Sequence, residues 1–410
     1  MEAAAPSAVE STQGLRFPRA PPNPTANIMP RSQKTIVSFH FDEVIVPARP
    51  GAVNTPGHHK PLHMLPVAGS AGWSIQFDAL PKLVLRMTLA DGTVGWGEFY
   101  RDHNWVTIKG VVDGLLGRSL DDLVLQDLPV PLSREYDGFE CAIWDATAKL
   151  LGVPIHRLLG GAVRDRVKVG AWSSYREPGE MGALAKRFLS EGYDCIKLKA
   201  GLDDDVVGWC REIKAAAPGM WVIIDPNQRW ENAGEARRRL RELDAIGNLL
   251  LIEDPIPRWM LQDYARLRTF TATPVVLHVA LPYVYLGQRP YEAINALAHG
   301  AVDGFNFNCG LARFRELDAI AHAANLPCWH GSEVDLGILE AMYVHSAAAA
   351  KSCTWPSDIF GRMIRSHDLL ETPLVFEPAY VKVPEGPGLG VTPSLEAIAS
   401  HKTGETVFAL

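Results

Sequence analysis

The feature that most restricts the fold of this chain is a repeat in its second half. Short β-rich runs recur there, and they begin at Val167, Cys195, Trp221, Leu249, Val275, Gly304, Pro327 and Lys351. Successive starts lie 28, 26, 28, 26, 29, 23 and 24 residues apart. Each interval accommodates one strand and one helix, and residues 232–244 and 311–325 carry apolar residues at helical spacing. Eight such units in series predict a parallel barrel of the (β/α)8 type.

The residues ahead of this repeat follow a different pattern. Strands are predicted at residues 36–46, 80–89 and 93–99, and helices at 107–116, 120–128 and 135–151. The pair Asp91-Gly92 between two apolar runs is a strong hairpin signal. Gly152 and Pro154 end the last helix in the usual order of a glycine cap followed by proline. This part of the chain is therefore expected to form an α+β unit.

A chain of 410 residues is too long for one compact core. The predicted division is a disordered tail over residues 1–34, an α+β domain over 35–160, the barrel over 161–371, and a segment over 372–410 that returns to the α+β domain. The tail is rich in Ala, Pro and Ser and lacks periodicity, which is typical of disorder. A targeting segment and a start at Met29 remain alternatives for it.

Charge and cysteine usage exclude several classes of partner. The formal net charge is -7 and no run of Lys and Arg occurs, so nothing indicates binding to nucleic acid or to an anionic membrane. No stretch of about 20 apolar residues predicts a transmembrane helix. The six cysteines show no CxxC pair, which favours reduced thiols and a cytoplasmic location. The expected partner is a small molecule.

Polar side chains follow the predicted barrel strands at the point where each strand ends. They are Lys197 and Lys199, Asp225 and Asn227, Glu253, His278, Asn308, and His330. Each alone has an ordinary explanation, such as a turn-forming Asp, a core histidine or a solvated lysine. Together they would converge at the carboxyl end of the barrel, where the active sites of such barrels lie. Burying so many ionisable groups is costly without a function.

These residue types suit one kind of chemistry. Lys197 and Lys199 are two apart on a strand and share one face, so each is expected to lower the proton affinity of the other. A lysine that is neutral near pH 7 can act as a base. Carboxylates on adjacent strands suit a hard divalent cation such as Mg²⁺. A base beside such an ion can remove the proton adjacent to a substrate carboxylate.

At this point the chain resembles a known family over residues 35–399. It is similar to the mandelate racemase/muconate lactonizing enzyme branch of the enolase superfamily. The resemblance lies in Gly95-Trp96-Gly97-Glu98, Ala142-Ile143-Trp144-Asp145, Leu158-Leu159-Gly160-Gly161, Lys197-Leu198-Lys199, Asp225-Pro226-Asn227, Ile252-Glu253-Asp254-Pro255 and Pro387-Gly388-Leu389-Gly390. It implies a TIM-type (β/α)7β barrel with an N-terminal α+β capping domain.

The resemblance also implies roles for individual residues. Lys199 would be the base, and Lys197 would contact the substrate carboxylate. Asp225 and Glu253 would bind Mg²⁺. A long loop over residues 50–73 of the capping domain would choose the substrate, and its candidates are His59, His63 and Trp73. Relatives are often dimers or octamers, so a homo-oligomer is expected.

This sequence departs from the family pattern on the fifth strand. Relatives carry a Glu after Gly there as the third metal ligand, whereas this chain reads Leu277-His278-Val279. We expect His278 to be the ligand, because it is the one coordinating side chain in this run. The alternative is a water in the metal shell with His278 contacting the substrate. A nitrogen ligand would also admit Mn²⁺ or another softer divalent ion.

Two further departures concern the remaining strands. The sixth strand offers Asn308 where relatives carry a lysine base or an aspartate that orients a histidine. On the seventh, His330 is the predicted general acid on the face opposite Lys199. Glu333 and Asp335 are alternatives for that role, and either could instead cap the following helix. Asn227, Asn308, Glu333 and Asp335 are therefore counted as candidate substrate-binding residues.

The predicted reaction is dehydration of a sugar acid or related hydroxy acid to a 2-keto acid. A base on one face and an acid on the other would remove the α-proton and protonate the departing hydroxyl. Racemisation, epimerisation and lactone cycloisomerisation share the first half of this reaction and are alternatives. A non-catalytic metal-binding paralogue is the second alternative, because a fold does not fix a function.

Overall fold

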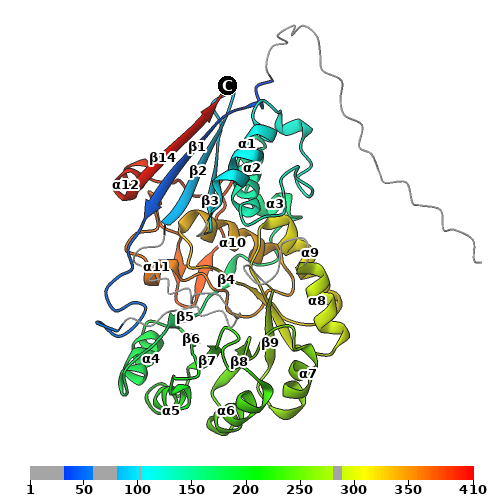
Figure 1. Cartoon of the computed structure of the whole chain (residues 1–410). Helices are drawn as coiled ribbons and strands as arrows, with labels where there is room; N and C mark the ends of the chain where they lie inside the picture. The colour runs from blue at the N-terminus through cyan, green and yellow to red at the C-terminus, as the bar shows by residue number, and fades with distance from the viewer. Residues whose placement is uncertain (1–31, 59–80, 101–102, 280–288) are drawn as a thin grey trace, which may run out of the picture.

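The computed structural model describes residues 32–58, 81–100, 103–279 and 289–410, and every structural statement below concerns these residues. The predicted tail lies outside them apart from residues 32–34. Two units are stacked, with the antiparallel sheet above and the barrel below in Figure 1. No helix in the described ranges is both long enough and apolar enough to cross a membrane.

The upper unit is a four-stranded antiparallel sheet backed by helices (Figure 1). Its strands, in the order β14-β1-β2-β3, are β14 (Lys402–Ala409), β1 (Ile36–Ile45), β2 (Pro81–Leu89) and β3 (Val94–Phe99). The helices are α1 (Trp105–Leu115), the 3₁₀ turn η2 (Leu120–Asp122), α2 (Tyr136–Leu150) and α3 (Ile155–Leu158). The predicted hairpin joins β2 to β3, and Gly92 takes the positive φ of 89° that its turn requires.

Helix α2 lies directly on strand β3 because two glycines leave room for it. A β-carbon on Gly95 would lie 2.1 Å from the Ala142 carbonyl oxygen, and one on Gly97 would lie 2.1 Å from that of Gly138. Any side chain at these positions would push the helix off the sheet. The glycines of Gly95-Trp96-Gly97 on β3 and the small residues Gly138 and Ala142 on α2 therefore form the contact between this strand and this helix.

The last strand of the chain completes the sheet of the first domain. β14 follows α12 (Leu395–His401) and pairs antiparallel with β1. The segment before it behaves differently, because β12 (Phe376–Glu377) and β13 (Tyr380–Lys382) form a small sheet with β4 (Arg166–Lys168) beside the barrel. The segment over residues 372–410 therefore divides between the two units.

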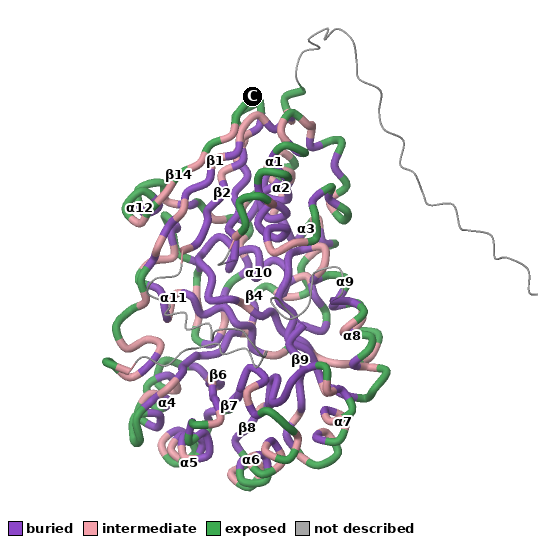
Figure 2. Tube along the Cα trace, in the orientation of Figure 1, coloured by how far each residue is buried: buried purple, intermediate pink, exposed green. Residues whose placement is uncertain are grey.

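The lower unit is a curled parallel sheet of seven strands. They are β5 (Ala171–Ser173), β6 (Cys195–Lys199), β7 (Trp221–Asp225), β8 (Leu249–Glu253), β9 (Val275–Val279), β10 (Gly304–Phe307) and β11 (Cys328–His330). The helices after them are α4 (Glu180–Ser190), α5 (Val206–Ala216), α6 (Ala233–Ile246), α7 (Leu261–Phe270), α8 (Arg289–Ala298), α9 (Leu311–Ala323), α10 (Gly337–Ala349) and α11 (Gly361–Ile364). Figure 2 shows the strands buried and the outer helix faces exposed.

The first and last runs of the predicted barrel are irregular. The run that begins at Val167 gives two strands: β4, which pairs antiparallel with β13, and β5, which is the first barrel strand. The run at Lys351 forms no full strand, but it makes parallel bridges from Cys353 to Cys328 and from Ser357 to Val169. This segment therefore links the two sides of the curled sheet. Its proline and short polar residues limit regular pairing.

A buried ionic cluster joins the two domains. The Lys82 ammonium of β2, with 1 % of its side chain exposed, contacts Glu98 Oε1 at 3.0 Å and the Asp335 carboxylate. Glu98 accepts the backbone N–H groups of Leu336 and Leu339 where α10 begins, and Tyr343 donates to Asp335 Oδ2 at 2.7 Å. Burial by itself lowers the pKa of Lys82, but Asp335 and Glu98 outweigh it and raise this pKa. Cap and barrel are thus held by a charged lysine.

Candidate active site

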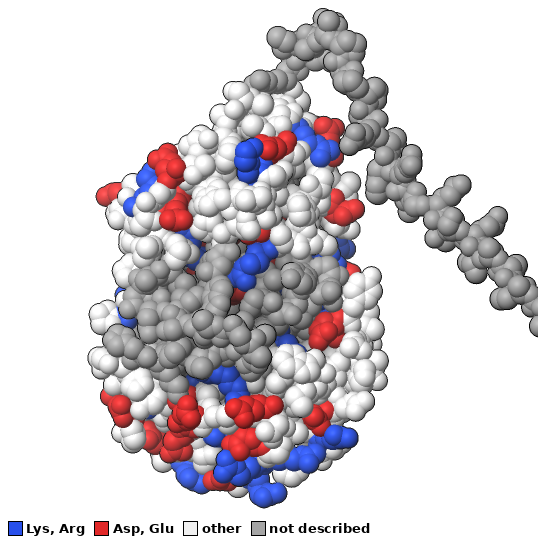
Figure 3. Space-filling view, in the orientation of Figure 1, with Lys and Arg blue, Asp and Glu red and all other residues white. Residues whose placement is uncertain are grey.

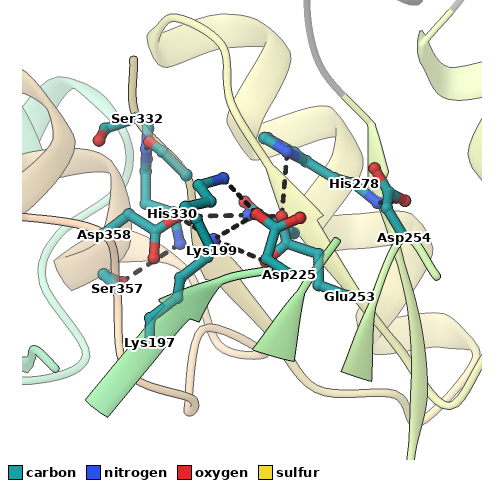
Figure 4. A network of polar contacts seen from close by, with 12 residues as sticks. Lys197, Lys199, Asp225, Glu253, Asp254, His278, His330, Ser332, Ser357 and Asp358 are labelled. Atoms are coloured by element: carbon teal, nitrogen blue, oxygen red, sulfur yellow. Dashed lines mark hydrogen bonds and ion pairs between the residues drawn. The ribbon is translucent and has the colours of Figure 1, made fainter. Parts of the chain in front are cut away.

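The two lysines of β6 meet the carboxylates at the ends of the next two strands, as Figure 4 shows. Lys197 Nζ lies 2.6 Å from Glu253 Oε2, 2.7 Å from Asp358 Oδ2 and 3.4 Å from Asp225 Oδ2. Lys199 Nζ contacts Asp225 Oδ2. The structure therefore brings four of the predicted site residues together at the carboxyl end of the barrel.

The lysines differ in their surroundings. Burial by itself lowers the pKa of Lys197, but Asp358, Glu253 and Asp225 raise it well above its ordinary value. Lys197 is therefore charged, and its three carboxylate partners outweigh the lowering of its proton affinity that was expected from Lys199. Lys199 has one carboxylate partner, and 12 % of its side chain is exposed against 4 % for Lys197. Of the two, Lys199 is the one open to a substrate.

Glu253 is the hub of the cluster. Burial alone would raise its pKa, but Lys197 and His278 bring it well below its ordinary value, so the group is ionised. Its Oε1 atom lies 3.1 Å from His278 Nδ1 and accepts a hydrogen bond of 2.9 Å from Asn306 Nδ2. The pKa of His278 falls to about 4, chiefly because the ring is buried, so the imidazole is neutral.

The residue after Glu253 fixes the position of His278. Asp254 Oδ1 accepts the backbone N–H of His278 at 3.0 Å, and its other oxygen accepts Arg258 Nε at 2.9 Å. Its φ of 44° turns the chain sharply after the strand. After this turn the two neighbouring carboxylates have different partners. Glu253 contacts Lys197 in the barrel interior, and Asp254 accepts the backbone N–H of His278 at the end of β9.

Asp225 and Glu253 have the chemistry of a divalent-ion site. They end adjacent strands, and both direct an oxygen at one cation, the Lys197 ammonium. Carboxylate oxygens are the donors that Mg²⁺ and Mn²⁺ take. His278 contacts Glu253 through Nδ1, and its Nε2 atom has no protein partner among the described residues, but the structure does not bring a His278 nitrogen into a three-donor group with both carboxylates. The role of His278 as third ligand therefore stays a prediction. Within the described ranges, donor atoms of three His, Cys, Asp or Glu residues lie within 4.8 Å of one another only in His40, Asp42 and Glu405.

That second group is an ion-pair network on the outer sheet. Lys402 Nζ lies 3.1 Å from Asp42 Oδ1 and 2.8 Å from Glu405 Oε2, so a cation already sits between the two carboxylates. Arg86 Nη2 approaches His40 Nδ1 at 3.0 Å. The side chains of His40, Asp42 and Glu405 therefore already have partners within the protein.

Two residues of the cluster were missed by the sequence reasoning. Asp358, which follows the eighth strand-like segment, binds Lys197, and burial raises its pKa to about 6 despite that partner. Asn306 joins Glu253 to Asp358, to which it donates at 3.4 Å. Reading one residue past the end of the eighth run would have found Asp358. Asn306, not Asn308, is the sixth-strand residue that faces the cluster.

His330 lies on the other side of its strand. Its neighbour Trp329 faces the barrel interior, where the Lys197 ammonium lies 5.7 Å from the indole. Consecutive strand residues point to opposite faces, so His330 faces the helices. Its ring stacks between Phe314 of α9 and Tyr343 of α10, and burial lowers its pKa to about 3. This placement does not support His330 as the general acid.

The remaining candidates mostly contact the capping domain. Asn308 Oδ1 accepts from Tyr100 at 3.2 Å, Glu333 pairs with Arg134 at 3.3 Å, and Asp335 belongs to the Lys82 cluster. These three residues therefore help to dock the cap. Asn227 follows Asp225, to which its backbone N–H donates, and has a φ of 49°. The candidates His59, His63 and Trp73 lie outside the described residues.

An apolar wall stands beside the lysines. Trp172 is the register partner of Lys197 on β5, and it packs with Val334, Phe360 and Ile364 in a cluster separate from the main core. Val53 of the capping domain covers this cluster. The lysine–carboxylate cluster therefore lies next to an apolar surface formed by these side chains.

The surface around the barrel carries mixed charge. On the face seen in Figure 3, Lys and Arg are interspersed with Asp and Glu, and the barrel helices below carry most of them. Exposed pairs such as Arg211 with Glu242 and Arg238 with Glu235 contribute to this pattern. Such a surface gives this face no field of a single sign.

Comparison with known proteins agrees with this geometry. Residues 180–398 match the family model described as "Enolase C-terminal domain-like". Muconate cycloisomerase 1 of Rhodococcus opacus is 30 % identical over 352 residues, which cover 78 % of this chain and 90 % of that protein. A probable glucarate dehydratase of Streptomyces coelicolor is 26 % identical, over 89 % of this chain and 90 % of that protein.

A solved structure shows the same fold. The crystal structure of N-succinyl Arg/Lys racemase from Bacillus cereus superposes with a TM-score of 0.77 at 18 % identity, over 91 % of this chain and 100 % of the other. The family match, the relative at 30 % identity and the shared cap-and-barrel architecture agree. This chain belongs to the enolase superfamily, in the mandelate racemase/muconate lactonizing enzyme family.

Proposed function

We propose that this protein removes the proton α to a substrate carboxylate and then expels a β-hydroxyl. The product of such a dehydration is an enol that becomes a 2-keto acid, and the substrate is a sugar acid or related hydroxy acid. The observation that carries the proposal is the lysine pair, with one ammonium fixed by three carboxylates and the other held by one.

The two lysines take different roles in this proposal. Lys197 is always charged and binds the substrate carboxylate. Lys199 takes the α-proton, because it has a single carboxylate partner and its side chain is more exposed to a substrate than that of Lys197. After that step the Lys199 ammonium donates a proton to the departing hydroxyl on the same face, which leaves as water. The C–H electron pair becomes the carbon–carbon double bond of the enol.

The inward residues of β10 and β11 favour elimination over racemisation. Racemisation needs a proton donor on the face opposite Lys199. Asn306 and Trp329 occupy the inward positions of these strands, and neither side chain exchanges protons near pH 7. The residues described on these two strands therefore favour a mechanism in which Lys199 makes both proton transfers on one face of the substrate.

Cycloisomerisation is the second candidate. It shares the Lys199 step, and the relative at 30 % identity is a muconate cycloisomerase. A non-catalytic paralogue is disfavoured, because burying Lys197 with three carboxylates would be costly without a function.

Asp225 and Glu253 would hold the divalent cation that enolase-superfamily members generally bind. When bound, Mg²⁺ or Mn²⁺ would stabilise the second negative charge that develops on the substrate carboxylate. We expect Glu253→Gln to weaken Mn²⁺ binding by more than about 100-fold, because it removes a charged ligand. His278→Ala should weaken it about 10-fold, because His278 contacts Glu253 and so orients a proposed ligand. Calorimetric titration of the apoprotein with Mn²⁺ measures both, and a loss in His278→Ala as large as that in Glu253→Gln would identify His278 as a ligand.

Proton NMR in D₂O tests the reaction. The protein is incubated with Mg²⁺ or Mn²⁺ and pools of sugar acids, hydroxy acids and lactones while the α-proton is observed. We expect that signal to disappear as the methylene of a keto acid appears. Loss of the signal without a new skeleton would assign an epimerase, and formation or opening of a lactone would assign a cycloisomerase. No change in any pool would contradict the proposal.

A further inference from the structure

Two cysteines that are not adjacent in the sequence are direct neighbours in the structure. Cys328 begins β11, and Cys353 lies in residues 351–358, called here the closing segment because it links the two sides of the curled sheet. The two cysteines are partners in a parallel bridge. The Cys328 N–H donates to the Ser352 carbonyl at 2.8 Å, and the Thr354 N–H donates to the Cys328 carbonyl at 3.1 Å. The backbone thus fixes the two cysteines side by side.

This pairing suits the geometry of a disulfide. Paired strands lie about 4.7–4.9 Å apart, which is within the range of about 4.4–6.8 Å between Cα atoms that a disulfide requires. Bridge partners project from the same face of a sheet, and the thiols of Cys328 and Cys353 are hydrogen-bonded to each other. A bond between the two sulfur atoms therefore needs no large movement of the backbone.

The two thiols are not equivalent. The hydrogen bond with Cys328 lowers the pKa of the Cys353 thiol against the effect of burial, and Ser357, whose Oγ lies 3.6 Å from the sulfur, adds to this. Burial raises the pKa of each of the other five thiols. Cys353 is 4 % exposed and precedes the exposed Thr354, whereas Cys328 is fully buried. Because the thiolate is the reactive form, Cys353 is the first thiol that an oxidant meets, and Cys328 lies behind it.

We propose that Cys328 and Cys353 form a redox modification site, at which hydrogen peroxide converts the two thiols to a disulfide that ties the closing segment to β11. The Cys353 thiolate attacks one peroxide oxygen, the O–O bond breaks, and the hydroxide that leaves takes up the thiol proton as water. The Cys328 sulfur then attacks the sulfenic acid of Cys353, and the hydroxyl group leaves with the Cys328 proton as a second water. Two thiols are oxidised, and one peroxide is reduced to two waters.

The disulfide adds a covalent link where the structure has few backbone links. The closing segment is bridged to the sheet at Cys353 and at Ser357, and its last residue, Asp358, binds Lys197. A bond at the first bridge opposes any opening of this segment. Oxidation therefore keeps Asp358 at the lysine instead of displacing it. This inference does not depend on which reaction the protein catalyses.

The experiment counts thiols in the reduced full-length chain before and after treatment with hydrogen peroxide. The wild-type protein should fall from six thiols to four, lose the mass of two hydrogen atoms, and recover both with dithiothreitol. Peptide mapping should join the peptide that contains Cys328 to the one that contains Cys353. Amide hydrogen exchange over residues 352–358 should slow at least about 3-fold on oxidation, because the new bond opposes opening of the segment.

Variants with one cysteine replaced separate the two roles. Cys328→Ala should stop at the sulfenic acid of Cys353, so the chain gains the mass of one oxygen atom and reacts with dimedone. Cys353→Ala should lose thiols at least about 10-fold more slowly than the wild type, because the thiol with the lowered pKa is gone. The matched control is Cys210→Ala, which removes a buried thiol of α5 and should lose two of its remaining thiols at the wild-type rate.

Several results would overturn this inference. They are a disulfide between any other pair of cysteines, equal rates of thiol loss in Cys353→Ala and the wild type, or no loss at a peroxide concentration that oxidises free glutathione. Unchanged hydrogen exchange over residues 352–358 in the disulfide form would show that the bond does not hold the closing segment, which also overturns it.

Discussion

Lys199→Ala should lose α-proton exchange by about 100- to 10 000-fold, the usual contribution of a positioned general base. The substitution removes the lysine that has a single carboxylate partner and keeps the one that has three. Asp225 retains a cation, because Lys197 Nζ lies 3.4 Å from its Oδ2 atom. The site loses one positive charge, but each of its three carboxylates still faces Lys197, and the variant should fold and bind substrate.

The measurement is the rate at which the α-proton signal of the substrate is lost in D₂O, followed by proton NMR. Lys109→Ala is the matched control, since Lys109 is an exposed lysine of α1 paired with Asp113. It should exchange at the wild-type rate. Circular dichroism and Mn²⁺ titration confirm that Lys199→Ala is folded and binds metal. Exchange within 10-fold of wild type would show that another group is the base.

Lys197→Ala makes an informative contrast. It leaves Glu253 and Asp358 without their shared ammonium, so it should weaken substrate binding and stability as well as rate. A change confined to rate in Lys199→Ala and a mixed change in Lys197→Ala would separate the base from the binding residue.

The predicted residues that the structure brings together follow a local rule. Lys199, Asp225 and Glu253 are the last residues of their strands, and Lys197 precedes Lys199 by two residues on the same face. Parallel strands bring such positions to one edge. The repeat length that predicted the barrel is equally local, because each unit is one strand and one helix. Both signals can be read without knowing any distant contact.

The misplaced residues depend on which face of a strand points inward. One residue of shift reverses every side chain, and runs of three to four strand residues give too little alternation to fix it. His330 was misplaced in this way, because the inward position of β11 belongs to Trp329. Asn308 lies two residues after Asn306, just beyond the end of β10, and contacts Tyr100 of the capping domain instead of the cluster. Pairing with His278 and a hydrogen bond to Glu253 identify Asn306 as the residue that faces the cluster.

Other roles depend on partners that are remote in sequence. Asp335 was a reasonable candidate acid, but its partner Lys82 is 253 residues away in the other domain. Asp358 was overlooked because its run forms bridges without a regular strand. Neither contact can be predicted from the local sequence. The contact of Asp335 with Lys82 joins the capping domain to the barrel, and the contact of Asp358 with Lys197 forms where the last segment meets the parallel sheet.

Lys82→Met should destabilise the protein by about 3–5 kcal/mol, the usual cost of leaving one side of a buried ion pair uncompensated. The change keeps the length and apolar stem of the side chain but removes its charge. Asp335 then loses the ammonium that, with Tyr343, brings its pKa below the ordinary value against the effect of burial. Glu98, which caps α10 through two backbone N–H groups, loses the same partner.

Urea unfolding followed by tryptophan fluorescence measures this loss. The matched control is Lys34→Met, since Lys34 forms an exposed pair with Asp121 and should change stability by less than about 1 kcal/mol. Adding Asp335→Asn to Lys82→Met should recover part of the loss, because it neutralises one of the stranded carboxylates. A Lys82→Met variant as stable as the control would show that Glu98 and Asp335 are held by their backbone and hydroxyl donors alone. The loss expected here is large because the Glu98 and Asp335 carboxylates are fully buried, so water cannot replace the missing ammonium. The Asp121 carboxylate, the partner of Lys34, is exposed and is hydrated when its lysine is removed.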